Sequence, residues 1–464
     1  MSLAAAVLTV GLVGVLLVPA PWTAPTPPPA SPPTGVGQPP LTDPAEALLR
    51  ERLGGLGSLL IGDDPLLQAC ADPGTAPPAL AEPASLAAVT AHTEALRRRE
   101  LVESPDIQLL PDAEMTARVA RSFRGRAEPA QVDLDTRALT GLGAIQPGTD
   151  LGSLRVDAFA EQVNGYHLGE QGVIGVRAAD DDPDRLRPLE RVVLAHELEH
   201  ALSFQHLGRP SDSRDGDEST DARLASAALV EGSATTTMLH YATAVLTPAQ
   251  QAVLRGDLRL RAGQGALAGY SPYLLAELQF PYREGLRYTC RRWLAGGWDE
   301  VEAGYRDPPA STAAVLFPER HGEQPRRPAT LADPGGPWEH ARTSSFGAAE
   351  LEWLLTAPGG EVSASLDQPR QRVSAWDGGE LAVWTNGDAT AVGLALVDRG
   401  GGPALCDTVR QWYAAAFPRA SQEQDGTRVR FDGPRQDAVL ACPGSQVRLG
   451  IAPTATVAAT ITAP

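Results

Sequence analysis

The sequence has 464 residues, of which 43% are hydrophobic, and its 57 acidic against 39 basic residues give a net charge of -18. This length is enough for about two or three domains with a sizeable hydrophobic core. The acidic balance, with no basic stripe to offset it, excludes nucleic acid as an expected partner.

The chain begins with an uncharged apolar run over residues 3–20, LAAAVLTVGLVGVLLVPA. As a helix this run would span roughly 27 Å, slightly less than the ~30 Å hydrocarbon core of a bilayer. The run is typical of a secretory signal peptide or a marginal signal anchor, although no positive residues precede it. We therefore expect residues 1–20 to direct export; the alternative is a buried or mis-started segment.

Two further segments precede the region that carries chemistry. Residues 21–46 are rich in proline and cannot form regular helix or sheet, so we predict an extended spacer that would hold the folded body away from a membrane. Residues 47–128 show mostly helical patterns, including a helix over 112–123 that follows a short strand over 107–110. No group of reactive side chains occurs there, so this region is expected to serve packing.

The centre of the sequence is His-Glu-x-x-His, formed by His196, Glu197 and His200. In a helix, a step of four residues places both imidazoles on one face, where they can bind one ion. Glu197 lies about 100° around the helix axis, close enough to hold a metal's water without being a ligand. Leu194 and Leu198 belong to an apolar stripe on the opposite side that predicts burial in a core. A solvated helix with two satisfied histidines is the alternative.

A catalytic zinc site has three protein ligands and leaves the fourth position for water, so a third ligand is needed. A second helix is predicted over residues 221–244, after an acidic, solvated loop at 212–221. Glu231 is the only carboxylate in the middle of that helix, 31 residues after His200. We take His196, His200 and Glu231 as ligands of Zn²⁺.

A short β-rich segment, GVIGVR at residues 172–177, stands before the metal helix. Zinc proteases commonly use an edge strand above the cleft to pair with an extended substrate. We expect residues 172–177 to be such an edge strand, with an ordinary sheet strand as the alternative.

Several segments resemble a family of bacterial exported zinc metallopeptidases of the gluzincin kind. The resemblance runs, with gaps, from about residue 130 to about residue 400 and rests on EQVNGYH, VVLAHELEHALSFQH, ALVEGSA, FPYREG, GGWDEVEAGYRDPPASTAAVLFPERH and SAWDGGEL. It implies a zincin-like fold, the same three ligands, and Glu197 as the catalytic base. It implies no substrate.

The sequence departs from this family at two places. Relatives typically carry Glu-Gly-Asp-Ala where this chain has serine at position 233, which removes an acid that could support the metal ligands. Asp221 is the nearest replacement in sequence; a helix N-cap is the alternative for it. The usual GYYD-like segment is GYHL here, and we expect its His167 to be exposed on the surface.

The chemistry that follows is hydrolysis of a peptide bond. Zinc lowers the pKa of its water and polarises a carbonyl, while Glu197 takes the water's proton and later passes it to the leaving amine. The oxyanion then needs a neutral donor, for which the candidates are Tyr282, His240 and Tyr241. We prefer Tyr282, in a predicted turn at FPY, 51 residues after Glu231, a separation similar to that in aminopeptidase-type gluzincins. A purely structural tyrosine is the alternative.

After Pro318 the sequence changes character. A loop over residues 321–337 precedes strand patterns with one helix, 408–417, between them, which predicts an α+β appendage. The predicted strands cover residues 380–385, 391–397, 428–431 and 446–451. Trp376 and Trp384 are expected to pack in its core and not to bind ligand.

The four cysteines are an even number, which is compatible with an oxidising compartment. We favour a disulfide between Cys406 and Cys442, which leaves Cys70 with Cys290; four buried free thiols are the alternative. No Cys-x-x-Cys occurs, so a thiolate metal site is not expected.

Together these patterns predict an α+β protein with a mainly helical zincin-like domain, a small edge sheet and a C-terminal α+β region. The expected boundaries are 1–20, 21–46, 47–128, 129–323 for the metallopeptidase domain and 324–464. The expected partner is a peptide or protein substrate, at the outer face of the cytoplasmic membrane or secreted. Two alternatives remain: a zinc-retaining but idle binding protein, and a hydrolase of cell-wall amides.

Overall fold

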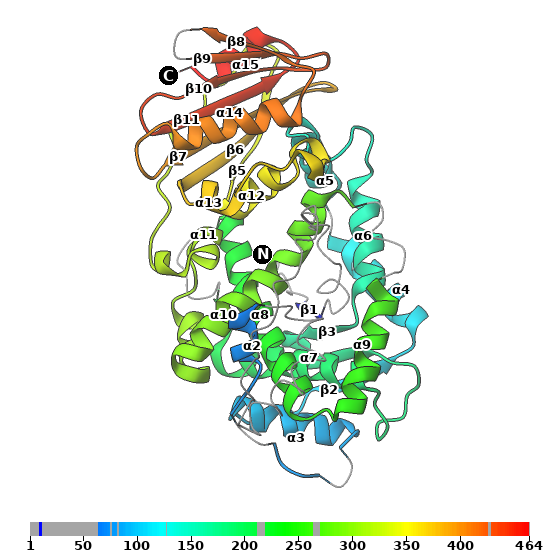
Figure 1. Ribbon diagram of the computed structural model, residues 1–464. Helices are drawn as coiled ribbons and strands as arrows, with labels where there is room; N and C mark the ends of the chain where they lie inside the picture. Colours follow the sequence, from blue (N-terminus) through cyan, green and yellow to red (C-terminus); the bar gives the residue numbers. More distant parts are fainter. Residues whose placement is uncertain are drawn as a thin grey trace, which may run out of the picture. The chain divides into compact units, whose positions relative to one another are not determined.

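The computed structural model describes residues 9–11, 64–74, 77–80, 83–126, 128–210, 219–262, 270–425 and 428–463. It confirms the α+β class, with a mostly helical N-terminal part that holds a small sheet and a C-terminal antiparallel sheet of seven strands (Figure 1). The predicted spacer at 21–46 lies outside the described residues, as does nearly all of the acidic loop at 212–221. Of the apolar run at 3–20, only residues 9–11 are described.

The chain divides into two compact units, each built from segments that are discontinuous in sequence. The first unit comprises residues 1–110, 164–202 and 234–264, and the second comprises residues 111–163, 203–233 and 265–464. Two long helices, α7 (Pro188–Leu207) and α8 (Thr220–Ala244), continue from one unit into the other.

The first unit contains a four-stranded sheet in the order β1-β3-β4-β2. β3 is antiparallel to both of its neighbours, whereas β2 and β4 run parallel. The strands are β1 (Thr9–Gly11), β2 (Asp106–Leu110), β3 (Gly165–Leu168) and β4 (Val173–Arg177).

The strand expected at the edge of this sheet is an inner strand, so that prediction was wrong. β4 is hydrogen-bonded to β3 on one side and to β2 on the other. Its run of apolar residues, of which Ile174 and Val176 are fully buried, reflects that inner position. On the far side of β3 lies β1, which pairs Gly11 with Gly165.

Helices pack around this sheet through a core of aliphatic side chains. Val193, Leu194 and Leu198 of α7 are buried in it together with Ile174 and Val176 of β4. The other helices of the first unit are α2 (Pro65–Cys70), α3 (Leu86–Arg97) and α9 (Pro248–Ala262). The apolar stripe predicted for the metal helix is therefore its buried face.

In the second unit, most of the helices precede the large sheet in the chain, and α12 and α13 lie between its first two strands. The helices include α4 (Asp112–Arg126), α5 (Pro129–Gly141), α6 (Leu151–Gln162), α10 (Pro272–Arg306), α11 (Thr312–Leu316), α12 (Ala348–Thr356) and α13 (Pro369–Val373).

The turn predicted at FPY does not exist, because Pro281 lies inside helix α10. A proline within a helix removes one backbone hydrogen bond. Buried side chains on both sides of it, including Phe280 and Leu286, favour the helix in spite of that loss. The real irregularity of α10 is a kink at Gly296 and Gly297, where Gly297 has a φ of 68°.

The C-terminal sheet has the strand order β5-β6-β7-β11-β10-β9-β8, and each adjacent pair is antiparallel. Four of its strands and its first helix were predicted from the sequence. The strands are β5 (Glu339–Ser345), β6 (Trp376–Asn386), β7 (Ala389–Asp398), β8 (Ser421–Asp425), β9 (Arg428–Asp432), β10 (Asp437–Ala441) and β11 (Gln446–Ala452), with helices α14 (Ala404–Ala416) and α15 (Ala455–Ile461).

Both faces of this sheet are covered. Leu381 and Val383 of β6 pack in the larger core with α14, whereas the alternate residues Ala382 and Trp384 pack with Ile461 of α15. Trp376 and Trp384 are buried, as predicted. The alternation of side chains in β6 thus fills two cores at once.

All four cysteines are in disulfides. Cys406 of α14 is bonded to Cys442, which follows β10, as predicted. Cys70 and Cys290 are disulfide-bonded as well, and no free cysteine remains. This is the pairing that the sequence favoured.

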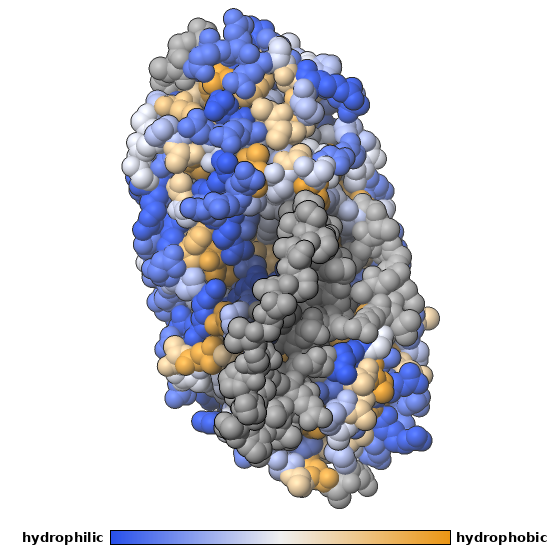
Figure 2. Space-filling view, in the orientation of Figure 1, coloured by the Kyte–Doolittle hydropathy of each residue, from blue (hydrophilic) through white to orange (hydrophobic). Residues whose placement is uncertain are grey.

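The surface of one face is mainly polar. On the face shown in Figure 2, the described residues are mainly hydrophilic, and hydrophobic residues form only small patches. None of the helices that the structure describes has the length and apolar content needed to span a bilayer.

Candidate metal centre

Helix α7 carries the first two candidate ligands, His196 and His200, one turn apart. Both side chains are buried, at 1% and 3% exposure, and so is every other residue from 191 to 200, which means that the helix is covered on the face of the histidines as well as on its apolar face. The start of the helix is fixed by Glu190, whose carboxylate accepts hydrogen bonds from the backbone N–H groups of Ala179 and Arg187 at 3.0 and 2.7 Å. The helix therefore holds its histidines away from bulk water.

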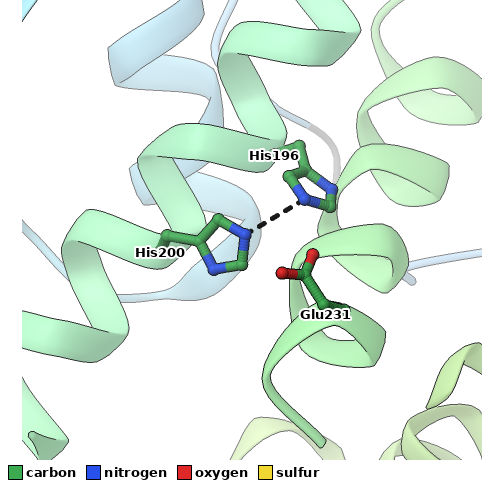
Figure 3. Close-up of side chains that lie close together, drawn as sticks. All are labelled: His196, His200 and Glu231. Carbon is green, nitrogen blue, oxygen red and sulfur yellow. Dashed lines mark hydrogen bonds between the residues drawn. The ribbon is translucent and has the colours of Figure 1, made fainter. Parts of the chain in front are cut away.

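Glu231 of α8 joins the two histidines, as Figure 3 shows. The candidate ligand atoms of the three residues lie within 4.8 Å of one another, and all three residues are buried. The Nε2 atoms of His196 and His200 are 3.1 Å apart, so they can share a proton or bind one ion. Two imidazole nitrogens and one carboxylate oxygen are a donor set that suits Zn²⁺ and related divalent metals. The chain thus contains a buried group that could hold a metal ion.

Two glycines let the helix of Glu231 approach α10. A Cβ atom at Gly232 would lie 2.2 Å from the carbonyl oxygen of Gly285, and one at Gly285 would lie 2.2 Å from that of Ala228. Either side chain would push the two backbones apart. The glycines of VEGSA and FPYREG therefore have a packing role that the sequence alone did not reveal.

Glu197, the expected base, is fully buried beside strand β3. A Cβ atom at Gly165 of that strand would lie 2.6 Å from Oε1 of Glu197 and 2.7 Å from Cγ1 of Val193. Only glycine fits between the strand and the helix at this point. Gly165 is therefore part of the site's construction, a role that the EQVNGYH segment containing it did not reveal.

A buried ion pair ties the metal helix to its neighbour. Glu199 lies on α7 between the two histidines and accepts a hydrogen bond from Nε of Arg97, the last residue of α3. Both side chains are completely buried. Sequence reasoning missed this pair because the partners are far apart in the chain.

Asp221 does not support the metal ligands, contrary to one expectation. Its carboxylate accepts hydrogen bonds from the N–H and the hydroxyl of Thr312, and its own N–H donates to Ser345 Oγ at 2.8 Å. It is not the helix N-cap either, because Ser219 Oγ accepts the hydrogen bond from Ala222 N. Asp221 instead fastens the start of α8 to the first residue of α11 and to the last residue of β5.

Two of the three candidate oxyanion donors have structural contacts. His240 Nε2 lies 2.8 Å from the carbonyl oxygen of Cys70, and burial lowers the pKa of this histidine to about 4, so it is neutral and donates that bond. The hydroxyl of Tyr241 accepts a hydrogen bond from Arg191 Nε at 3.1 Å. Burial raises the pKa of Tyr241. These contacts explain both residues as parts of the core of the first unit.

The remaining predicted residues are Tyr282 and His167. Tyr282 is buried within α10, and its role stays a prediction. His167 is 4% exposed on β3, so the expectation of a surface histidine was wrong. Its strand lies between β1 and β4. Ser233, which stands where relatives carry an acid, is fully buried in α8.

Comparison of the chain with family models, with curated proteins and with solved structures finds no match. What the fold and the site define is an α+β protein with a buried His-His-Glu group consistent with an HExxH...E metal site.

Proposed function

We propose that the protein is a zinc-dependent hydrolase of peptide bonds that acts outside the cytoplasmic membrane. The observation that carries this proposal is the convergence of His196, His200 and Glu231, with Glu197 next to the first ligand on the same helix. A structural metal site would not need a buried carboxylate beside its ligands that takes no part in the group.

Zinc bound by these residues would supply a water of lowered pKa and a polarised carbonyl. Glu197 would take a proton at its carboxylate and later return it to the leaving amine. Its burial against Gly165 keeps the carboxylate in one position and away from bulk water, where electrostatic interactions are stronger than in solution. Tyr282 is our candidate for the donor that stabilises the oxyanion.

One side of β3 already pairs with an extended segment of the chain, which favours an extended peptide as the substrate. That segment is the antiparallel strand β1, whose Gly11 stands opposite Gly165. Because Gly165 lies against Glu197, a chain segment that pairs with β3 passes beside the proposed base. Backbone pairing of this kind recognises extended peptides without demanding a particular sequence.

Location outside the cytoplasm is supported by the two disulfides. Structural disulfides persist in oxidising compartments and are rare in the cytosol. All four cysteines of the chain are paired, so none is left for a thiolate metal site.

The first prediction is that Glu197→Gln keeps zinc and loses hydrolysis, because the amide cannot accept a proton in the catalytic step. We expect a loss of at least about a hundredfold, the typical contribution of a general base. Cleavage of a diverse peptide library, followed by mass spectrometry, is the measurement. The exposed Glu361 supplies a control, Glu361→Gln, that should cleave normally.

If the wild-type chain binds a full complement of zinc and cleaves no peptide, the proposal that it is a peptide hydrolase is wrong. That result would favour an idle, zinc-retaining binding protein, which the serine at position 233 already makes worth testing. Cell-wall amides added to the library would distinguish a peptidase from a cell-wall amide hydrolase. The two activities need the same residues and differ only in substrate.

A further inference from the structure

The second unit contains a large charged cavity that the proposed hydrolysis does not use. Its volume is about 1250 Å³, and its walls come from α5, α6, the first turn of α8, the end of α10, and strands β5 and β6. Small-molecule sites usually measure about 300–1,000 Å³, so this cavity can take a small molecule. Six arginines line it: Arg155, Arg223, Arg306, Arg326, Arg327 and Arg342. The same lining carries six acidic residues, Asp135, Asp221, Glu277, Asp307, Glu350 and Glu380, so its charge balance depends on which of them are already paired or neutral.

The carboxylates that line the cavity already have donors. Asp135 binds Arg155 at 2.9 Å and Arg342 at 2.5 Å, and Glu277 binds Arg155 at 3.3 Å. Asp221 accepts hydrogen bonds from Thr312, and Glu350 accepts one from Gly347 N; Asp307 lies 3.4 Å from His321, and Glu380 has only an ion-pair contact with Arg327 at 3.6 Å. These acids do not offer an open site for a cation.

The groups left with spare donors are arginines at the exposed part of the lining. The guanidinium of Arg306, at the end of α10, makes no ion pair or hydrogen bond within the part of the chain that the structure describes. The side chain of Arg327 is 89% exposed and lies 3.6 Å from the carboxylate of Glu380, too far for a hydrogen bond. A guanidinium presents five N–H donors in a planar fork that matches carboxylate and phosphate groups.

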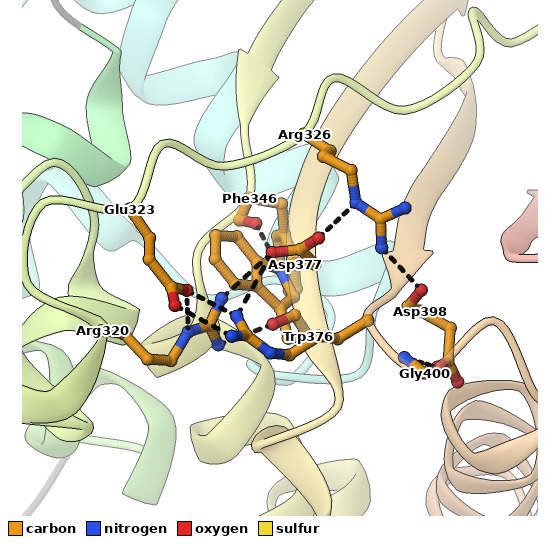
Figure 4. A network of polar contacts seen from close by, with 9 residues as sticks. Arg320, Glu323, Arg326, Phe346, Trp376, Asp377, Asp398 and Gly400 are labelled. Atoms are coloured by element: carbon orange, nitrogen blue, oxygen red, sulfur yellow. Dashed lines mark hydrogen bonds and ion pairs between the residues drawn. The ribbon is translucent and has the colours of Figure 1, made fainter.

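An ionic network holds the segment that carries Arg326 and Arg327 (Figure 4). Arg326 donates to Asp377 and to the carbonyl oxygen of Asp398, and Asp377 also binds Arg320. Arg320 donates in turn to the carbonyl oxygen of Trp376 at 2.7 Å. Because Trp376 is buried in the core, the segment with Arg326 and Arg327 is fastened to the sheet, and the guanidinium of Arg326 is held in place.

Two further features favour negative charge inside. Burial raises the pKa of Glu350 to about 8, so this carboxyl is mostly neutral at pH 7 and does not cancel an arginine. Residues 219–223, the first turn of the 25-residue helix α8, also line the cavity. The start of a helix carries a partial positive charge.

We propose that this cavity binds a small ligand with two or more acidic groups, carboxylate or phosphate, through Arg306, Arg326 and Arg327. The spare donors of Arg306 and Arg327, the neutral Glu350 and the first turn of α8 all act in the same direction. The site is built within the second unit alone, so it does not depend on whether the metal centre hydrolyses peptides.

Titration calorimetry on the full chain tests the proposal, with inorganic phosphate and propane-1,2,3-tricarboxylate as the probes. The chain carries His196→Ala, so that the anions do not act on bound metal. We expect one site per chain, weakened about tenfold or more by the double change Arg306→Gln and Arg327→Gln. Whichever probe binds more tightly identifies the chemical class.

A matched control is Arg435→Gln, which removes an exposed arginine outside the cavity lining and should leave binding unchanged. Circular dichroism and the melting temperature check that each variant folds. The proposal is overturned if neither anion binds at concentrations on the order of 10 mM. It is also overturned if the double variant binds as the wild type does, or if the control weakens binding equally.

The pH dependence supplies an independent readout. Glu350 is faced by Asp221, Glu277, Arg342 and the N–H of Gly347. As the pH rises from 7 to 9, Glu350 ionises and adds negative charge, so the tricarboxylate should bind more weakly. In Glu350→Gln this weakening should disappear, and an equal weakening in that variant would contradict the assignment.

Discussion

At the scale of single residues, the proposed chemistry depends on how Glu197 is held. The spacing of the histidines predicts its role, but the residue that positions it is Gly165, which lies on a strand 32 positions earlier in the chain. Nothing in the sequence around Gly165 indicates this contact, because it arises only when β3 packs on α7. The same limit applies to His167, whose strand lies between β1 and β4.

Gly165→Ala tests this contact. The new methyl group would stand 2.6 Å from Oε1 of Glu197 and 2.7 Å from Cγ1 of Val193, so the strand or the helix must move. We expect the free energy of unfolding to fall by about 1–3 kcal/mol and hydrolysis to be largely lost. Urea denaturation and the peptide-cleavage assay measure the two effects.

The matched control is Gly256→Ala in the exposed part of α9, where an added Cβ meets no atom within 4 Å. This change should stabilise the protein by up to about 1 kcal/mol, because alanine favours a helix over glycine. If Gly165→Ala behaves like the control and cleaves normally, β3 does not hold Glu197.

At the scale of elements, the position of helix α7 depends on a neighbour that the motif does not mention. The pair of Arg97 and Glu199 joins the end of α3 to the turn between the two histidines, with both charges buried. Removing one partner leaves an unpaired charge in the interior, which typically costs about 3–5 kcal/mol. The orientation of the metal helix should suffer at the same time.

A double-mutant cycle with Arg97→Met and Glu199→Met tests this statement. Each single change should destabilise the chain by about 3–5 kcal/mol, and the double change by clearly less than their sum. The exposed pair Arg118 and Glu114 on α4 is the control and should couple by about 1 kcal/mol at most. Urea denaturation gives the energies, and additive effects at Arg97 and Glu199 would show that the pair does not act as a unit.

At the scale of the whole molecule, the periodicity of the sequence predicted the α+β class, the strands β6, β7, β9 and β11, and the helix α14. The sequence pattern did not predict features that depend on the order of strands in a sheet. Residues 172–177 formed a strand, as their composition indicated, but only the pairing of β2 on its far side makes it an inner strand. The ligand group was predictable because a helix converts a spacing of four into one face, whereas the cavity of the second unit combines residues from seven helices and strands.

The central claim is that His196, His200 and Glu231 together hold one metal ion, and metal analysis of the purified chain tests it most directly. We predict about one zinc per wild-type chain, and a clear loss in His196→Ala and in Glu231→Ala, because a catalytic zinc site has three protein ligands. Glu361→Ala is the control and should keep the wild-type stoichiometry. Zinc content that stays unchanged in the Glu231 variant, or a wild-type chain that binds no metal, would contradict the account.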